Sequence, residues 1–239
     1  MKQNYVETEN LIYQKKNFFV QFLLDAVTVI FGIIAIFIIG FTIIYDNAVV
    51  SGVSMQPTLN PLGGDKSDIV YINKLEKIYY GDIVVLEKNA SIDINHVIKR
   101  VIGLPGDVIE IKQTSNGIFV FRNGEKLDED YIFNTATGGD PNNFGMNTTL
   151  NNFIEFRRKV LSNPKNYDAV FDSHNRLVLQ KNQVFVLGDN RGYSIDSSSE
   201  GPLSLNDVVG KVDFIVPYET APFYYFLKHY TGIDLTWIK

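Results

Sequence analysis

The chain has 239 residues, of which 45% are apolar, and a formal net charge of −5. This length and apolar content exclude a disordered chain and suit one folded domain with an appendage. The acidic balance excludes the basic surface on which nucleic-acid binding depends, so we predict no nucleic-acid partner. Without cysteine, the chain has no disulfide, no thiolate nucleophile and no cysteine-based zinc site.

The first element is an apolar segment, residues 26–45, whose 20 side chains carry no charge. A helix of this length spans about 30 Å, the thickness of the hydrocarbon core of a bilayer. The apolar run is longer than that of a cleaved signal peptide, and no Ala-x-Ala site follows it. We therefore predict one retained transmembrane helix that contacts membrane lipid.

The charges that flank this helix predict its orientation. Lys15 and Lys16 lie just before it, whereas the first basic residue after it is Lys66. Basic residues tend to stay on the cytoplasmic side. We therefore predict a single-pass cell-membrane protein with a cytoplasmic tail at 1–25 and an extracytoplasmic domain at 46–239.

Beyond the helix, short runs of β-branched residues alternate with turns rich in Gly, Pro and Asn. The pairs Asn116-Gly117 and Asn123-Gly124 predict tight hairpin turns. Evenly spaced short strands predict a mostly β domain, a sandwich or a barrel. We expect strands at 68–73, 81–86, 97–102, 108–112, 118–121, 184–187 and 208–217.

Two regions depart from this strand pattern. Residues 113–182 are rich in Asn and Gly, and we predict an outer lobe there with one short helix at 153–161. The aromatic residues at 223–226, with Trp237, fit either a belt at the membrane interface or packing onto the domain.

Ser54 lies in the segment Ser-Met-Gln-Pro-Thr-Leu at 54–59, which suits neither a helix nor a strand. Taken alone, this segment favours an ordinary loop with an inert, solvated serine, because most serines are exposed and have no catalytic role. A catalytic role for Ser54 therefore requires a base that another part of the chain supplies.

Lys99 shares one face of its expected strand with Val97 and Val101. It is either an exposed lysine that protects a sheet edge or a lysine that faces inward. In the inward case, desolvation disfavours the ammonium and lowers the pKa of Lys99. Such a lysine can act as a general base and take the proton of a serine hydroxyl.

A third polar stretch, residues 188–197, follows an expected strand and contains Ser194 and Asp196. An Asp in direct contact with Lys99 would stabilise the ammonium and raise the pKa of the lysine, so the lysine could not act as a base. A neutral Ser194 hydroxyl against the amine, with Asp196 behind it, suits a base better. The alternative is an ordinary polar hairpin turn.

Together, these stretches resemble the ordered motifs of the bacterial type I signal peptidases, in the variant with Gly-x-Ser-Met. The matching residues, in family order, are Ser54-Met55-x-Pro57-Thr58-Leu59, Gly81-Asp82-Ile83-Val84, Lys99-Arg100-Val101-Ile102-Gly103-x-Pro105-Gly106-Asp107 and Gly188-Asp189-Asn190-x-x-x-Ser194-x-Asp196-Ser197. Four motifs in register are a far stronger signal than one.

The resemblance implies a β-rich catalytic domain after a membrane anchor. It implies a membrane-bound serine endopeptidase that removes the signal peptides of secretory pre-proteins after small residues at positions −1 and −3, through an acyl-enzyme. Ser54 is then the nucleophile, Lys99 the general base, Ser194 the group that orients the lysine and Asp196 its support. No metal and no cofactor are implied.

One departure from the family pattern concerns Asp196. The last motif usually ends Asp-Ser-Arg, but here Ser198 stands in the place of the arginine. Either Arg191 or Arg100 pairs with Asp196 instead, or the support of Asp196 is looser.

A second departure concerns the oxyanion hole. Some members carry a serine two residues before the nucleophile, where this chain has Gly52. We therefore expect backbone N–H groups, chiefly that of Ser54, to stabilise the oxyanion, with the Ser51 hydroxyl as a weaker candidate.

Two other functions stay open at this point. One is a catalytically dead extracytoplasmic binding module, which the missing arginine at position 198 allows but an intact Ser54 and Lys99 argue against. The other is a Ser/Lys self-cleaving protein like the SOS-response repressors, in which a DNA-binding domain would stand where this chain has its apolar helix.

Overall fold

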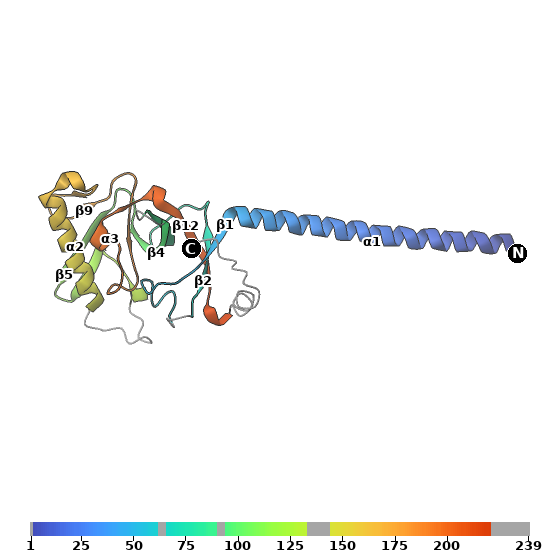
Figure 1. The fold of residues 1–239 in the computed structure, drawn as a ribbon, viewed down its shortest axis with the longest axis horizontal. Coiled ribbons are helices and arrows are strands. Elements are labelled where there is room, and N and C mark those ends of the chain that lie inside the picture. Colours follow the sequence, from blue (N-terminus) through green and yellow to red (C-terminus); the bar gives the residue numbers. More distant parts are fainter. Residues whose placement is uncertain (1, 62–65, 90–93, 133–143, 221–239) are drawn as a thin grey trace. The chain divides into compact units, whose positions relative to one another are not determined.

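The computed structural model describes residues 2–61, 66–89, 94–132 and 144–220. The chain divides into two compact units, Met1–Tyr45 and Asp46–Lys239. Figure 1 traces both units in chain order. The aromatic residues at 223–226 and Trp237 lie outside the described residues, as does the Asn-rich part of the expected lobe at 133–143.

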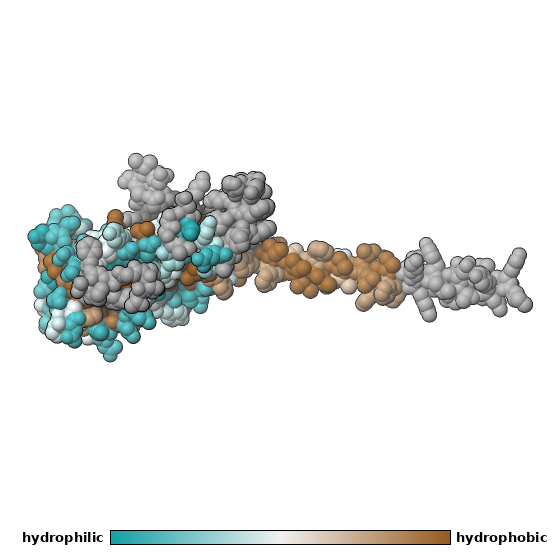
Figure 2. All heavy atoms as spheres, turned by 90° about the horizontal axis from the view of Figure 1, so that it is seen from below, coloured by the Kyte–Doolittle hydropathy of each residue, from teal (hydrophilic) through white to brown (hydrophobic). Residues whose placement is uncertain are grey.

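The first unit is a single helix, α1 (Lys2–Ile44). Its part Phe18–Ile44 has 27 residues and includes an 18-residue stretch with a mean hydropathy of 2.9, none of which is buried. On the face of this part that Figure 2 shows, apolar side chains predominate. By length and composition this helix can cross a membrane. It begins well before residue 26, where the uncharged run of the sequence starts.

The second unit contains two antiparallel sheets, so the mostly β prediction is confirmed. The larger sheet has seven strands in the order β1-β2-β12-β3-β4-β10-β11. Its strands are β1 (Tyr45–Val49), β2 (Ile69–Asn73), β3 (Ile83–Asn89), β4 (Ile94–Gly103), β10 (Gln183–Leu187), β11 (Leu203–Ser204) and β12 (Val208–Val216).

The smaller sheet has five strands in the order β7-β6-β5-β9-β8. Its strands are β5 (Val108–Thr114), β6 (Gly117–Arg122), β7 (Glu125–Lys126), β8 (Val170–Phe171) and β9 (Leu177–Val178). We call this sheet, together with the helix α2 (Phe144–Ser162) and the segment 127–132, the outer lobe. Each of the seven expected strands is present, with ends shifted by a few residues.

Both expected hairpin turns are confirmed. Thr114 pairs with Gly117 where β5 turns into β6. Asn123 and Gly124, between β6 and β7, have φ values of 56° and 87°. Asn and Gly tolerate this left-handed backbone region, and it matches the twist of a tight hairpin.

Helix α2 begins nine residues before the short helix predicted at 153–161. Its first turns contain Gly145 and Thr149, which are poor helix formers, so the sequence pattern did not predict these turns. Tertiary packing overrides that propensity. The Phe153 ring meets Phe185 of β10 edge to face at 6.2 Å, and Phe156 packs against Gly201, where a Cβ would collide with the ring.

Candidate active site

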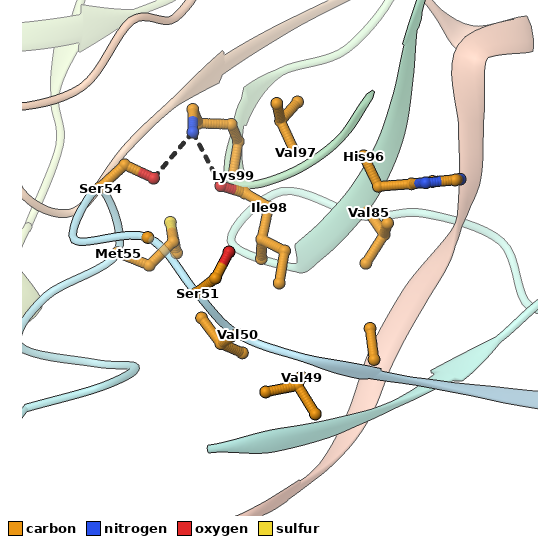
Figure 3. Close-up of a pocket in the computed structure, with 12 residues that line it drawn as sticks. Val49, Val50, Ser51, Ser54, Met55, Val85, His96, Val97, Ile98 and Lys99 are labelled. Carbon is orange, nitrogen blue, oxygen red and sulfur yellow. Dashed lines mark hydrogen bonds between the residues drawn. The ribbon is translucent and has the colours of Figure 1, made fainter. Parts of the chain in front are cut away.

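Ser54 lies in a turn that two buried neighbours hold in place. Met55 and Leu59 are 1% and 0% exposed and belong to a core that they share with Val70 of β2. The Leu59 N–H donates to the Met55 carbonyl at 2.9 Å, which closes the turn. Ser54 itself stays half-buried, with its hydroxyl directed toward Lys99 (Figure 3).

Lys99 lies on β4, opposite Val84 of β3. Its strand neighbours Val97 and Val101 pack in the same apolar cluster, and Lys99 is only 4% exposed. Lys99 therefore faces inward in the structure and is not an exposed lysine at a sheet edge. The Nζ donates to Ser54 Oγ at 2.9 Å and to the Ile98 carbonyl at 3.0 Å (Figure 3).

The turn that follows β10 holds the Ser54 segment from the other side. The Asn190 backbone N–H donates to the Ser54 carbonyl at 3.0 Å, and its side-chain amide donates to the Val53 carbonyl at 3.0 Å. Gly188 begins this turn, and a Cβ there would collide with the Ser194 side chain and with the Ser54 carbonyl oxygen. Only glycine therefore allows the two serine-bearing segments to approach so closely.

Ser194 is 7% exposed, and its hydroxyl has no hydrogen-bond partner among the described residues. The expected hydrogen bond between Ser194 and the Lys99 amine is therefore absent from this structure. The hydroxyl lies against Gly188, in the same turn that binds the Ser54 backbone.

Asp196 caps the short helix α3 (Ser197–Glu200). Its carboxylate accepts the Ser198 N–H at 3.0 Å, the Ser198 hydroxyl at 2.8 Å and the Gly188 N–H at 3.0 Å. Charged acceptors at a helix N-cap form strong hydrogen bonds of this kind. Ser198 thus fills the position of the family's arginine with a hydroxyl that reaches Asp196 directly.

The expectation that Arg191 or Arg100 pairs with Asp196 is wrong. Arg100 pairs with Asp189, with Nε to Oδ1 at 2.8 Å, and Arg191 pairs with Glu129. Burial alone lowers the pKa of Arg100, but the hydrogen bond and the charge of Asp189 raise it above its usual value. Two amides and one hydroxyl satisfy Asp196, so no arginine is needed there.

Three residues of this region, Asp189, Thr58 and Glu129, make contacts that were not predicted from the sequence. Asp189 is 2% exposed and accepts both Arg100 and the Thr58 hydroxyl, so it ties β4 to the Ser54 segment. Asp189 and Thr58 belong to the sequence motifs, which could have pointed to both residues. Glu129 stands in no motif, and nothing in the sequence pointed to it.

A pocket opens beside Ser54 and Lys99 (Figure 3). Apolar side chains dominate its wall, and the Ser51 hydroxyl points into it. β10 pairs with β4 at Arg100, Val101 and Gly103, beyond the part of β4 that faces the pocket. The lining residues are 48–52, Ser54 and Met55 on one side and Val85 and 96–99 on the other.

Three comparisons place this chain among known proteins. The family model described as signal peptidase, peptidase S26, matches residues 23–217. A signal peptidase I of Bacillus caldolyticus is 32% identical over 72% of this chain and 79% of its own length. A signal peptidase IB of Staphylococcus aureus is 31% identical over 79% of this chain and 85% of its own length.

Among solved structures, that of a signal peptidase I from Enterococcus faecalis V583 matches with a TM-score of 0.36 and 25% identity. The match covers 57% of this chain and 97% of the other.

The β-rich domain and these matches define a serine peptidase, which is a hydrolase. The chain belongs to the signal peptidase family, peptidase S26. It is a membrane signal peptidase, and its substrates are secretory pre-proteins. Neither a catalytically dead binding module nor a self-cleaving repressor fits these relatives.

Proposed function

We propose that Ser54 is the nucleophile of this signal peptidase and Lys99 its general base. The observation that carries the proposal is the contact of 2.9 Å between Lys99 Nζ and Ser54 Oγ, with the lysine only 4% exposed. Burial among apolar side chains disfavours the ammonium relative to the neutral amine. A neutral amine at hydrogen-bond distance can accept the hydroxyl proton.

The reaction then runs in two stages. The Ser54 oxygen attacks the carbonyl carbon of the scissile bond while its proton passes to Lys99, and the lysine then gives this proton to the leaving amine. The new N-terminus departs and leaves an ester on Ser54. Lys99 next takes a proton from water, the hydroxide attacks the ester carbon, and the proton returns to the Ser54 oxygen as the acid is released.

The Ser54 backbone N–H is the main donor proposed for the oxyanion. Within the described part of the chain it has no hydrogen-bond acceptor, so it is available to the substrate. Gly52 adds no side chain beside it, and the Ser51 hydroxyl points into the same pocket as a weaker second donor. Donors placed where charge develops stabilise the transition state more than the ground state.

Ser194 and Asp196 are proposed as supporting residues. A buried hydroxyl without a partner is costly, and a hydrogen bond from the Lys99 amine to Ser194 in the substrate complex would relieve that cost. Asp196 accepts the Gly188 N–H and so fixes this glycine. Because Ser194 packs against Gly188, Asp196 supports the position of Ser194.

The signal peptide is proposed to bind as an extended strand in the pocket between residues 48–52 and β4. Strand addition places alternate side chains of the peptide on one face, so the side chains at positions −1 and −3 face the same wall of the pocket. Met55, Val85 and Ile98 bound this wall and leave room for small side chains.

A change of the −1 Ala of a cleaved pre-protein to Phe is therefore expected to lower kcat/KM about 100-fold or more, because a bulky ring displaces the scissile carbonyl from Ser54. The measurement is initial cleavage by the full-length enzyme, followed on gels. The same change at position −2 is the matched control, since that side chain points out of the wall, and it should cost little. Equal rates for the −1 variant and the parent substrate would contradict the pocket assignment.

We also propose that the N-terminus lies in the cytoplasm and residues 46–239 outside it. Lys15 and Lys16 before the apolar helix support this orientation. In intact spheroplasts, an added protease should degrade the region after residue 45, and a cytoplasmic marker protein should survive. If that region resists digestion until the membrane is broken, the orientation is inverted.

A further inference from the structure

A buried ion pair links the catalytic turn to the outer lobe. Arg191, in the turn between Gly188 and Ser194, is 5% exposed, and both terminal nitrogens of its guanidinium bind the Glu129 carboxylate. Its Nε donates to the Gly188 carbonyl at 3.0 Å. Burial alone lowers the pKa of Arg191, but Glu129 raises it, so the guanidinium stays charged. One guanidinium thus holds the turn and the outer lobe together.

Glu129 is itself fixed within a second set of contacts. The Tyr131 hydroxyl donates to Glu129 Oε1 at 2.9 Å, and the Tyr131 ring lies 4.0 Å beneath the Arg100 guanidinium. Burial, followed by the charge of Glu129, raises the pKa of Tyr131, so its hydroxyl remains a donor. Since Arg100 binds Asp189, the outer lobe reaches the turn at two positions, 189 and 191.

Helix α2 presses on the same turn. A Cβ at Gly145 would lie 3.0 Å from both Arg191 Cβ and the Gly192 nitrogen, which is tighter than ordinary packing. The Thr149 hydroxyl donates to the Gly145 carbonyl at 3.0 Å and lies 3.4 Å from the Arg191 carbonyl. The backbone of α2 therefore rests directly on the backbone of the turn.

Stability alone does not require such a pair, because hydrophobic residues of similar volume often replace a buried ion pair without loss. What a hydrophobic pair cannot supply is the donor to the Gly188 carbonyl. Asp196 holds the N–H of Gly188 and Arg191 holds its carbonyl, so both polar groups of this residue are fixed from different sides. Ser194 and the Ser54 carbonyl pack against the same glycine.

We propose that Glu129 and Arg191 are positioning residues, through which the outer lobe sets the place of Ser194 beside the Ser54/Lys99 pair. This inference rests on the proposed catalytic roles of those residues. Glu129 and Arg191 touch neither Ser54 nor Lys99 in the structure's hydrogen bonds, and they act through Gly188. The outer lobe then serves catalysis as well as packing.

The test compares the double variant Glu129→Leu/Arg191→Met with the wild type, both full length in detergent, on a synthetic peptide with Ala at positions −1 and −3. Removing both partners leaves no unpaired charge, so we expect a folded protein. Its melting temperature should be lower than that of the wild type, because the Gly188 carbonyl and the Tyr131 hydroxyl each lose a hydrogen-bond partner. We expect kcat to fall about 10- to 100-fold because the geometry around Lys99 loosens. KM should change less than about twofold, since the substrate wall lies on β4 and residues 48–52.

The pH–rate profile is the readout that a purely structural pair would not move. A change in the surroundings of Lys99 shifts the pH at which the rate rises, whereas a loss of folded protein scales the whole profile. Glu155→Gln, in the exposed α2 pair Glu155–Arg158, is the matched control and should change neither kcat nor the profile.

A folded double variant with wild-type kcat and an unmoved profile overturns the inference. If the double variant fails to fold, Gly145→Ala decides, because it displaces Arg191 and Gly192 by a few tenths of an ångström and Ala favours the helix. Normal kcat in folded Gly145→Ala then counts against the proposal, and a lowered kcat with a moved profile supports it. Activity that survives Ser54→Ala would instead refute the proposed function, so the two failures are distinguishable.

Discussion

Replacing Ser54 by Ala is expected to lower kcat/KM for a pre-protein by about a millionfold, to the level of the background reaction. No other group is proposed to form the acyl-enzyme, and Lys99 has nothing to deprotonate once the hydroxyl is gone. The fold should be unaffected, since Met55 and Leu59, and not the Ser54 hydroxyl, bury this turn. Cleavage by purified Ser54→Ala protein, measured with a large excess of enzyme, gives the comparison.

Circular dichroism and thermal melting must accompany this measurement, because an unfolded variant says nothing about chemistry. Ser115→Ala, in the exposed turn between β5 and β6, is a matched control and should cleave at the rate of the wild type. If folded Ser54→Ala retains near-normal turnover, another nucleophile operates and the assignment of Ser54 is wrong.

Replacing Lys99 by Arg is expected to reduce kcat by about 10⁴-fold, although it preserves a positive charge. A guanidinium stays protonated at every usable pH and cannot accept the Ser54 proton. The wild-type rate should rise with pH as the Lys99 amine loses its proton, and the variant should show no such rise. Single-turnover cleavage measured across a pH series tests both expectations.

Lys99→Met is the matched control for the larger size of arginine at this buried position. It removes the charge while filling a similar volume, so it should be folded and equally inactive. A folded Lys99→Arg enzyme with substantial activity would reduce Lys99 to an electrostatic role. Loss of folding in the Arg variant alone would leave the Met variant as the test of the base.

Local patterns in the sequence determined the strands and the hairpin turns of this protein. The alternation around Lys99 and the Asn-Gly pairs act over a few residues, so their signal needs no knowledge of the tertiary fold. The unburied 27-residue stretch of α1 could be predicted for the same reason, since its largely apolar composition alone suits a membrane. The motifs also contained Ser54, Lys99, Ser194 and Asp196.

Tertiary structure alone decided which of these residues meet and which partners they take. Arg100 and Asp189 are 89 residues apart, and Arg191 and Glu129 are 62 apart, so no local rule chooses these pairs over Asp196. The early start of α2 likewise follows from contacts of Gly145 with the turn at 191–192, which override weak helix propensity. Burial of Lys99 depends on how the sheet packs around it, because the pattern of a strand shows which residues share a face but not which face is inside.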